Sequence, residues 1–566
     1  MPTTDINNRS IETEPIRHPL GMKAKILLTS VYGPYARDDQ DGSRAINPME
    51  LYHNQVTRVQ GPFSLRMFHR SFGLLLMQAN IDAPCAVLDF PSQERFEQEL
   101  RRNPYDIVGI SSILCNIGKV QKMCSIIRKI LPNAKIVIGG HIANVPNLSQ
   151  KIDSDLIVKG DGIRWFREYL GQNPDAPIRH PAVLSGFGSR ILGVQGSNKA
   201  RDLAAVLIPS VGCPMSCNFC STSHLFGGKG KSVEFFKTGD ELFRIMCSIE
   251  KKLNTRSFFV LDENFLFYRE KILRLLQLME EHGKSWSFYI FSSANVIRTY
   301  SIDQLVRLGV RWLWMGLEGK NSAYAKLHGT DSRALVKTLQ ENGISVLGSS
   351  IIGLDEHSEE NLDEVIDWAI AHQTDFHQFM LYTALPGTPL YREKEAEGSL
   401  LPVDDLSFAD SHGQYRLNHR HPGISDLKGT EFLIEAFDRD FRKNGPSLAR
   451  MIETTLKAYK NLRRHPSARV RTRIKRESAP LAVDYAGVLW ALRQWYENDP
   501  EVYFKLHNLL EALIKEFGLL TRIAAPVLGS FLLRTIKKED TRLKKGWTYE
   551  PPCFFELNPA AQKAFR

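Results

Sequence analysis

The segment from Ile208 to Cys220 reads Ile208-Pro-Ser-Val-Gly-Cys213-Pro-Met-Ser-Cys217-Asn-Phe219-Cys220. Its three cysteines are spaced by four and three residues, directly after an apolar run that predicts a strand over 204–209. A loop that follows a strand can bring three thiolates around one metal group. Thiolates are soft ligands, which suit iron–sulfur clusters or zinc. The other cysteines, at 85, 115, 124, 247 and 553, are scattered, so the pattern is not that of a disulfide framework.

The cysteine segment opens a region in which short apolar runs alternate with helical patterns. Beyond 204–209, the candidate strands are 258–261, 287–291, 312–316, 345–352 and 378–385. Six strand–helix units predict a parallel barrel, or part of one, over residues 201–395. In such barrels the chemistry gathers at the C-terminal ends of the strands, which is where the cysteines fall.

A second alternation precedes this region. Residues 22–170 contain β-branched, nearly continuous apolar runs, which are typical of strands covered on both faces of a parallel sheet. Those runs lie at 25–29, 85–89, 107–111, 135–139 and 155–159. They predict a doubly wound sheet of the Rossmann or flavodoxin type.

The remaining segments complete the predicted organisation. We expect a disordered tail at 1–21, a Gly-, Pro- and Ser-rich linker at 171–200, and a mostly helical C-terminal domain at 396–566. The predicted fold class is therefore α/β, with a doubly wound N-terminal domain, a central partial (β/α)6 TIM barrel and a C-terminal α-helical domain.

Composition limits the kind of protein. The 566 residues are 43% hydrophobic and 24% charged, which is typical of a soluble chain of several domains. No run of eighteen apolar residues predicts a membrane span, and the polar N-terminus lacks a signal core, so we expect a cytoplasmic location. The net charge of +10 lies partly in a basic run at 463–476. That run lacks interleaved aromatic residues, so it favours a solvated helical face over a nucleic-acid partner.

Two metal groups fit the cysteine segment. Zinc would take Cys213, Cys217, Cys220 and His224 as a Cys₃His set, although this spacing is not a common finger pattern. A four-iron, four-sulfur (4Fe-4S) cluster held by three cysteines would keep one iron without a protein ligand. Such an open iron is what a catalytic cluster needs and an electron-transfer cluster lacks.

The spacing C-x3-C-x-aromatic-C, with Phe219 as the aromatic residue, resembles that of the radical S-adenosylmethionine (SAM) superfamily. The resemblance implies that Cys213, Cys217 and Cys220 hold a 4Fe-4S cluster whose open iron binds SAM. It implies cleavage of SAM to methionine and a 5′-deoxyadenosyl radical. It also implies a small-molecule substrate and an external electron donor, such as flavodoxin or ferredoxin.

Short motifs at the ends of the later strands extend the resemblance. The superfamily uses such positions to bind the amino group, carboxylate, ribose and adenine of SAM. The residues implied here are Phe219, Asp262, Glu263, Ser292, Asn295, Glu318, Ile351 and Gly353. Each has a structural alternative, such as a helix N-cap for the acidic pair Asp262-Glu263.

A doubly wound domain before such a barrel resembles the cobalamin-binding subclass. The implied cobalamin contacts are Ser111, Ser112, Gly139, Gly140, Gly160 and Asp161. Glycines permit close approach of the backbone to a ligand, and helix N-termini bind phosphate. The chain lacks the Asp-x-His-x-x-Gly motif that many cobalamin proteins carry after the first strand. An ordinary flavodoxin-like domain with glycine turns is therefore the alternative.

The resemblance predicts a cobalamin-dependent methyltransferase that acts on an unactivated carbon of a small molecule or natural product. A cyclisation, oxidation or rearrangement with the same cofactors stays open, because nothing in the sequence separates these outcomes. A tRNA methylthiotransferase would need a second cluster on Cys85, Cys115 and Cys124, two of which fall in a predicted strand and a predicted helix. A zinc-stabilised binding protein is the non-catalytic alternative. The sequence assigns no catalytic residue beyond these cofactor contacts.

Overall fold

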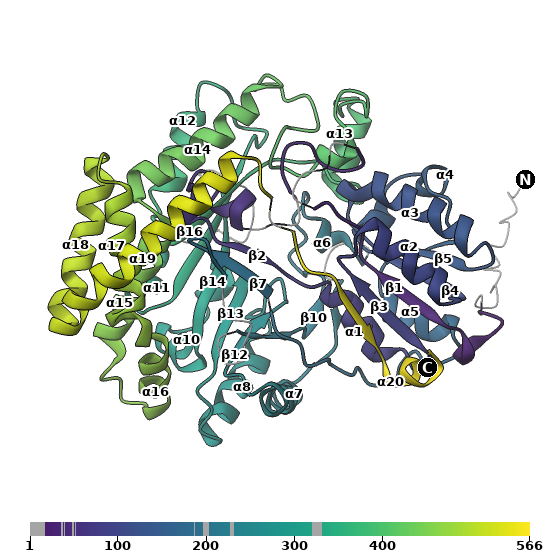
Figure 1. Cartoon of the computed structure of the whole chain (residues 1–566), viewed down its shortest axis with the longest axis horizontal. Helices are drawn as coiled ribbons and strands as arrows, with labels where there is room; N and C mark the ends of the chain where they lie inside the picture. Colours follow the sequence, from purple (N-terminus) through teal and green to yellow (C-terminus); the bar gives the residue numbers. More distant parts are fainter. Residues whose placement is uncertain are drawn as a thin grey trace, which may run out of the picture.

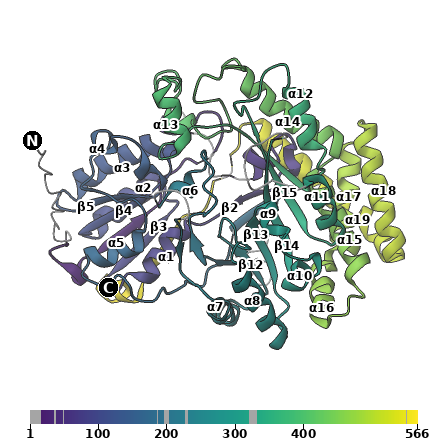
Figure 2. The same cartoon turned by 180° about the vertical axis from the view of Figure 1, so that it is seen from behind.

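The computed structural model describes residues 17–565, except 36–37, 39, 48–49, 51, 186, 196–202, 227–230, 320–330 and 549. Two mainly parallel sheets lie next to each other, and a bundle of C-terminal helices covers the far side of the second sheet (Figure 1). The same arrangement is visible from behind (Figure 2). Residues 1–16 of the predicted tail lie outside the described residues.

The first sheet has the order β17-β3-β1-β4-β5-β6, and all its neighbours are parallel except β17. Its strands are β1 (Ile26–Thr29), β3 (Cys85–Asp89), β4 (Ile107–Ser111), β5 (Lys135–Gly139), β6 (Leu156–Ile157) and β17 (Phe554–Leu557). Its helices are α1 (Phe72–Asn80), α2 (Gln93–Arg102), α3 (Ile117–Ile130), α4 (Leu148–Lys151) and α5 (Gly162–Tyr169). Alternate side chains of the strands enter two separate hydrophobic cores, as Leu27 and Leu28 do, and this confirms a doubly wound sheet.

The second sheet has the order β16-β15-β14-β13-β12-β9, with every pair parallel. Its strands are β9 (Ala205–Leu207), β12 (Ser257–Val260), β13 (Ser287–Ser292), β14 (Val310–Glu318), β15 (Ser345–Ile352) and β16 (Phe376–Leu381). The helices along this region are α6 (Ser221–His224), α7 (Gly239–Leu253), α8 (Arg269–Glu281), α9 (Ala294–Ile297), α10 (Ile302–Leu308), α11 (Ser332–Glu341), α12 (Leu362–Ile370) and α13 (Pro389–Ala396). The sheet is the predicted partial barrel, with β9 and β16 at its two ends.

Two small sheets complete the β structure. One has the order β2-β7-β8, formed by β2 (Arg66–Phe68), β7 (Phe187–Ile191) and β8 (Val194–Gln195). The other pairs β10 (Ser210–Val211) with β11 (Val233–Glu234) on either side of the cysteine segment. Part of the predicted linker at 171–200 is therefore strand, and the domain boundaries stay predictions.

The C-terminal region contains α14 (Lys428–Asn444), α15 (Ser447–Leu462), α16 (Ala468–Glu477), α17 (Asp484–Trp495), α18 (Pro500–Phe517), α19 (Leu519–Lys544) and α20 (Pro559–Ala564). The backbones of α17 and α19 approach closely, because a Cβ added at Gly529 would lie 2.5 Å from the Trp490 ring. Within the described part of the chain, α19 alone is long and apolar enough to cross a membrane by these two criteria.

The prediction of a mostly helical region after residue 396 misses one strand. β17 pairs antiparallel with β3, so the end of the chain adds a strand to the edge of the N-terminal sheet. The guanidinium of Arg70 supports this return: it forms ion pairs with Glu556 and, at 3.5 Å, with Asp89, and lies over the Phe554 ring. A four-residue strand that depends on a partner several hundred residues away has no local sequence signal.

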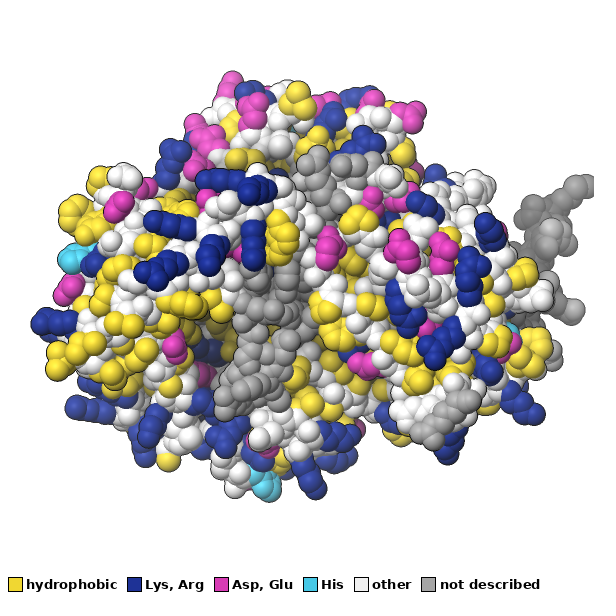
Figure 3. All heavy atoms as spheres, viewed as in Figure 1, with side chains coloured by type: hydrophobic (Ala, Val, Ile, Leu, Met, Phe, Trp, Pro, Cys, Tyr) yellow, Lys and Arg dark blue, Asp and Glu magenta, His cyan; other side chains and the backbone are white. Residues whose placement is uncertain are grey.

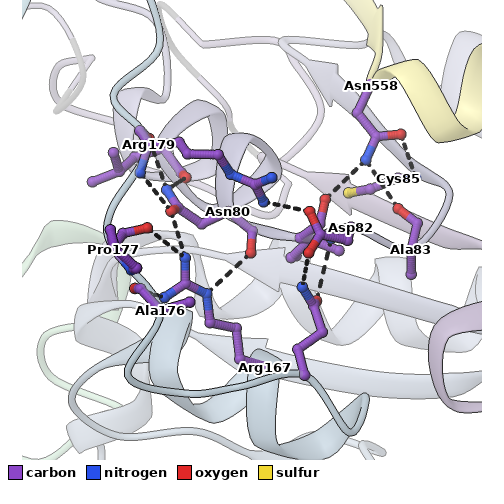
Figure 4. A network of polar contacts seen from close by, with 12 residues as sticks. Asn80, Asp82, Ala83, Cys85, Arg167, Ala176, Pro177, Arg179 and Asn558 are labelled. Atoms are coloured by element: carbon purple, nitrogen blue, oxygen red, sulfur yellow. Dashed lines mark hydrogen bonds and ion pairs between the residues drawn. The ribbon is translucent and has the colours of Figure 1, made fainter.

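Buried polar side chains attach the C-terminal end of the chain and the start of the linker to the N-terminal sheet (Figure 4). The Asn558 amide accepts a hydrogen bond from the backbone N–H of Cys85 at 3.1 Å and donates to the carbonyls of Ile81 and Ala83 at 3.1 and 2.9 Å. The buried Arg167 guanidinium of α5 donates to the Asn80 side chain at 2.8 Å and to carbonyls at the start of the linker. Each group satisfies backbone carbonyls that would otherwise be buried without partners.

We expect Asn558→Ala to lower the free energy of unfolding by about 2 kcal/mol, because it leaves the buried Cys85 N–H and two buried carbonyls without hydrogen-bond partners. Hydrogen–deuterium exchange across residues 554–557 should rise in the same variant. Urea unfolding followed by fluorescence measures the first effect. Gln562→Ala, at an exposed position on α20, is the control. Equal stability of the two variants would contradict the role given to Asn558.

Candidate functional site

The cysteine segment leaves β9 through a tight turn. Gly212 has a φ of +90°, and a Cβ there would lie 2.9 Å from the Phe226 ring. The backbone N–H of Cys220 donates to the carbonyl of Cys217 at 3.1 Å, which curls the loop. As a result Cys213, Cys217 and Cys220 all line one cavity of about 460 Å³ at the C-terminal ends of the strands. Burial raises the pKa of the Cys213 thiol to about 11.

Contacts across the barrel mouth hold the loop in place. The Asn218 side-chain amide donates to the Tyr382 hydroxyl at 3.1 Å, and the Phe219 ring packs edge-on against Tyr382 at 6.0 Å between centroids. The backbone N–H of Leu390 donates to the Asn218 carbonyl at 3.2 Å. The loop that follows the first strand of the barrel is therefore fixed to residues that follow the last strand.

A buried polar network joins the ends of β12 and β13. The Asn264 side chain donates to the Ser293 hydroxyl at 3.0 Å and accepts from the Ser292 hydroxyl at 2.7 Å. All three side chains line the same cavity as the cysteines. The network fixes which polar atoms face that cavity, because a satisfied buried amide has little freedom to rotate.

Two carboxylates, Glu263 and Glu318, also line this cavity. Glu318 is buried, and its φ of +55° is uncommon for a residue with a side chain. It lies where the register between β14 and β15 shifts. Such a conformation costs about 1–3 kcal/mol, and the surrounding structure must hold it in place.

The structure separates the predicted SAM contacts into two groups. Phe219, Glu263, Ser292, Glu318 and Ile351 line the cavity with the three cysteines. The remaining three, Asp262, Asn295 and Gly353, are absent from its lining.

Local partners occupy each of these three residues. Asp262 accepts from the Ser210 hydroxyl at 2.7 Å, and burial raises its pKa. The Asn295 side chain accepts from the next backbone N–H at 2.9 Å, within α9. Gly353, at a φ of +86°, donates from its N–H to His357 at 3.1 Å.

Several residues of the cavity have no place in the sequence prediction. Asn264 directly follows Glu263 in the sequence, and Ser293 directly follows Ser292. The two motifs therefore located this part of the cavity, but Asn264 and Ser293 were not among the predicted contacts. Trp314 shares the inward face of β14 with Gly316 by the period of two. His412 reaches the cavity from the segment after α13, without a local signal, and burial lowers its pKa to about 4. The missed lining residues include Met215, Ser223, Asn264, Phe291, Ser293, Trp314, Gln378, Met380, Tyr382, Thr383 and His412.

A second cavity, of about 200 Å³, lies at the C-terminal ends of the strands of the N-terminal sheet. Its predicted lining residues are Ser111, Gly139, Gly140, Gly160 and Asp161. Ser112 lies outside it, and its backbone N–H donates to the carbonyl of Gly139 at 3.1 Å. Asp161 caps α5 by accepting from the backbone N–H groups of Ile163 and Arg164 at 3.0 and 3.1 Å.

The stretch 211–226, which contains the three cysteines, forms a common wall between the two cavities. Val211, Leu225 and Phe226 line the cavity of the N-terminal sheet. The residues between them, Cys213 to Ser223, contribute to the cavity of the barrel. Groups bound in the two cavities would therefore be separated by this one stretch of chain.

The donor geometry bears on the kind of metal group. In the described ranges, no three His, Cys, Asp or Glu side chains converge closely enough to hold a single metal ion. The His224 ring nitrogen Nε2 contacts the Cys217 carbonyl oxygen at 3.1 Å, so it is engaged by the backbone. Three thiols spread around a shared cavity fit a large cluster better than one tetrahedral zinc ion.

The two adjacent glycines of the second cavity give a matched test. Gly140 has a φ of +82°, and a Cβ there would lie 2.7 Å from the Ser112 carbonyl oxygen, whereas a Cβ at Gly139 meets no atom within 4 Å. We expect Gly140→Ala to lower the free energy of unfolding by about 2 kcal/mol and Gly139→Ala to change it by less than about 0.5 kcal/mol. Denaturant unfolding measures both, and a reversed order would contradict the geometry.

Comparisons with known proteins identify a family for the region that contains the cysteine segment. A family model of the radical SAM superfamily matches residues 207–369. An uncharacterized methyltransferase of Pyrococcus horikoshii is 23% identical over 56% of this chain and 74% of its own length. The anaerobic magnesium-protoporphyrin IX monomethyl ester cyclase of Cereibacter sphaeroides is 24% identical over 57% of this chain and 58% of its own length.

One solved structure resembles the whole arrangement. It is the radical SAM methyltransferase TsrM from Kitasatospora setae, with cobalamin and a 4Fe-4S cluster bound. The TM-score is 0.51 at 14% identity, over 81% of this chain and 100% of TsrM, and this likeness confirms the predicted fold class. The matched family region contains the cysteine segment and the ends of five of the six barrel strands. Residues 207–369 of this chain therefore form a radical SAM domain.

Proposed function

We propose that this protein is a radical SAM methyltransferase that uses a 4Fe-4S cluster, SAM and cobalamin to methylate an unactivated carbon of a small molecule. The observation that carries the proposal is the common wall: the single stretch 211–226 supplies three cysteines to the barrel cavity and three apolar side chains to the cavity of the N-terminal sheet. That arrangement suits an enzyme in which two bound cofactors serve one substrate.

Cys213, Cys217 and Cys220 would hold the cluster, which supplies the electron that cleaves SAM and so starts radical chemistry. The chain's own residues would bind and orient SAM. Glu263 and Glu318 present carboxylates that can accept hydrogen bonds from an ammonium group. Ser292, fixed by Asn264, offers a polar edge, and Ile351 offers an apolar surface for a flat base.

The cavity of the N-terminal sheet fits part of a cobalamin. Its lining is mostly apolar and glycine-rich, and its size suits one flat aromatic base, such as the end of the nucleotide tail, rather than a whole corrin ring. The corrin would then lie outside this cavity. Gly139 and Gly160 permit close approach of the backbone to the ligand. Asp161, which caps α5, would position that helix rather than bind the cofactor directly.

A third cavity extends the barrel site inward and is a candidate for substrate. It has a volume of about 190 Å³ and shares Phe291 and Trp314 with the cysteine cavity. Its walls are mainly apolar, with the aromatic residues Phe259, Tyr289 and Trp312 among them. Such a lining favours an apolar group on the substrate over a charged one.

A reaction without methyl transfer is the second candidate. The observation that favours it is the cyclase relative, whose name describes ring formation rather than methylation. Both reactions require the same cofactor set, so the cofactors alone do not separate them. The product does, because methyl transfer from isotopically labelled SAM adds the label to the substrate and cyclisation does not.

The structure weighs against a tRNA methylthiotransferase. Cys85, Cys115 and Cys124 are buried, and Cys85 and Cys124 belong to different hydrophobic cores. These thiols are therefore not arranged to share a second cluster. The cytoplasmic location and the flavodoxin or ferredoxin electron donor stay predictions.

We expect anaerobically reconstituted protein to hold about four iron atoms per chain, with little zinc. Cys217→Ala should lose most of this iron and the brown absorbance, because two thiolates cannot hold the cluster firmly. Metal analysis by mass spectrometry measures both. Cys247→Ala, which removes a half-buried thiol on α7, is the control and should keep its iron. Full iron in the Cys217 variant, or zinc alone in the wild type, would overturn the assignment.

Gly139→Leu tests the cobalamin site separately. The added side chain would project into the cavity of the N-terminal sheet, since no atom lies within 4 Å of the position of its Cβ. Cobalt retained after incubation with hydroxocobalamin and desalting should fall at least about fivefold, while iron stays unchanged. Unchanged cobalt in this variant would argue that the cavity does not bind cobalamin.

A further inference from the structure

The long helix α19 has two faces with different surroundings. One face packs into the C-terminal bundle through the buried residues Thr521, Ala525, Gly529, Leu532, Ile536 and Glu539. The contact is close, since a Cβ at Gly487 of α17 would lie 2.8 Å from the Leu528 side chain. This packing fixes which side chains of α19 point outward.

The outward face of the first half of α19 is apolar. Leu519, Ile523, Val527 and Phe531 follow one another at intervals of four, and Leu520 lies beside them. Each of the five side chains is between 58% and 70% exposed. A soluble protein seldom leaves so many large apolar side chains together in water without a use for them.

The outward face of the second half is cationic. Arg534, Lys537 and Lys538 continue the same face, are exposed, and form no ion pair within the described part of the chain. Two further basic residues pair within the helix, Arg542 with Glu539 at 3.8 Å and Lys544 with Asp540 at 2.8 Å. Figure 3 shows hydrophobic side chains where α19 begins and a row of Lys and Arg side chains along its later course.

We propose that this face of α19 docks the protein on the surface of an anionic lipid bilayer. The apolar half would enter the boundary between headgroups and acyl chains, and the cationic half would lie over anionic headgroups. A helix that combines Leu, Ile, Val and Phe with Lys and Arg on its lipid-facing side meets both requirements of an interfacial helix. None of these side chains lines the cysteine cavity or the cavity of the N-terminal sheet, so the proposal does not depend on the proposed reaction.

Docking on the surface fits the structure better than crossing the membrane. By length and composition α19 could span a bilayer. To do so it would have to leave α17 and expose the bundle core that Leu532 and Ile536 help to fill.

A second copy of the chain is a poorer occupant. In an antiparallel contact along the whole helix, the cationic half of one copy would face the apolar half of the other. A contact limited to the five apolar side chains would be small against the roughly 1,200 Å² or more that stable interfaces bury. The charge of the second half has no counterpart in either arrangement, whereas an anionic bilayer provides one.

Sedimentation with lipid vesicles tests the proposal on the full reconstituted chain. We expect it to bind vesicles of equal parts phosphatidylcholine and phosphatidylglycerol, and to bind pure phosphatidylcholine much more weakly. The double variants Ile523→Glu/Val527→Glu and Lys537→Glu/Lys538→Glu should each lose at least about tenfold in affinity. Raising the salt concentration should weaken the wild type, because the cationic half acts through charge.

Matched variants at other exposed places are the controls. Leu427→Glu removes an apolar side chain that is 69% exposed at the start of α14, and Arg333→Glu/Lys337→Glu reverses two charges on α11. Both should bind vesicles as the wild type does, and thermal unfolding should show all variants folded. Wild-type protein that stays in solution with anionic vesicles would overturn the proposal. So would equal losses in the controls, or a dimer in analytical ultracentrifugation that only the α19 apolar variant abolishes while vesicle binding persists.

Discussion

The parallel pairing of strands is the constraint on which the rest of the structure depends. Because every neighbour from β9 to β16 runs in the same direction, each strand ends at the same edge of the sheet and delivers its following loop there. The three cysteines, the two carboxylates and the Asn264 network come from loops far apart in the sequence. They line one cavity because parallel strands bring the residues at their C-terminal ends to the same edge of the sheet.

The same constraint applies to the N-terminal sheet, and the two sets of strand ends meet at the cysteine segment. This loop is held from both sides. Tyr382 fixes it to the end of the last barrel strand, and Phe226 packs against Gly212 where the loop begins. A loop that separates two sites must be rigid if groups in those sites are to stay at a constant distance. The contacts of Asn218 and Phe219 give it that rigidity.

Much of this architecture could be predicted from the sequence, because buried parallel strands consist of short, continuous runs of apolar residues. The run from Ser345 to Ile352 corresponds to a strand with the same bounds, and so do the runs at Cys85–Asp89, Ile107–Ser111 and Lys135–Gly139. The cysteines could be identified equally well, since their chemistry requires close spacing. Features that depend on partners distant in the sequence could not be predicted. β17 exists only through its pairing with β3, and His412 enters the cavity from a segment without regular pattern.

Individual contacts were harder to predict than the cavity they belong to. Asp262 and Glu263 are adjacent in the sequence, yet Asp262 turns to Ser210 while Glu263 faces the cavity. A pattern of residue types locates the end of a strand, but the direction of each side chain depends on backbone geometry such as the positive φ of Glu318. The outward face of α19 is a similar case, since apolar residues at helical spacing predict a core until the bundle shows which face is covered.

The central claim is that the three-cysteine loop holds a cluster with one iron left open for SAM. Electron paramagnetic resonance of the reduced protein, recorded with and without SAM, tests it most directly. The account predicts the signal of a reduced 4Fe-4S cluster whose g-values shift when SAM is added, because SAM would bind at the open iron. A cluster signal that SAM does not alter, or no cluster signal from fully reconstituted protein, would contradict it.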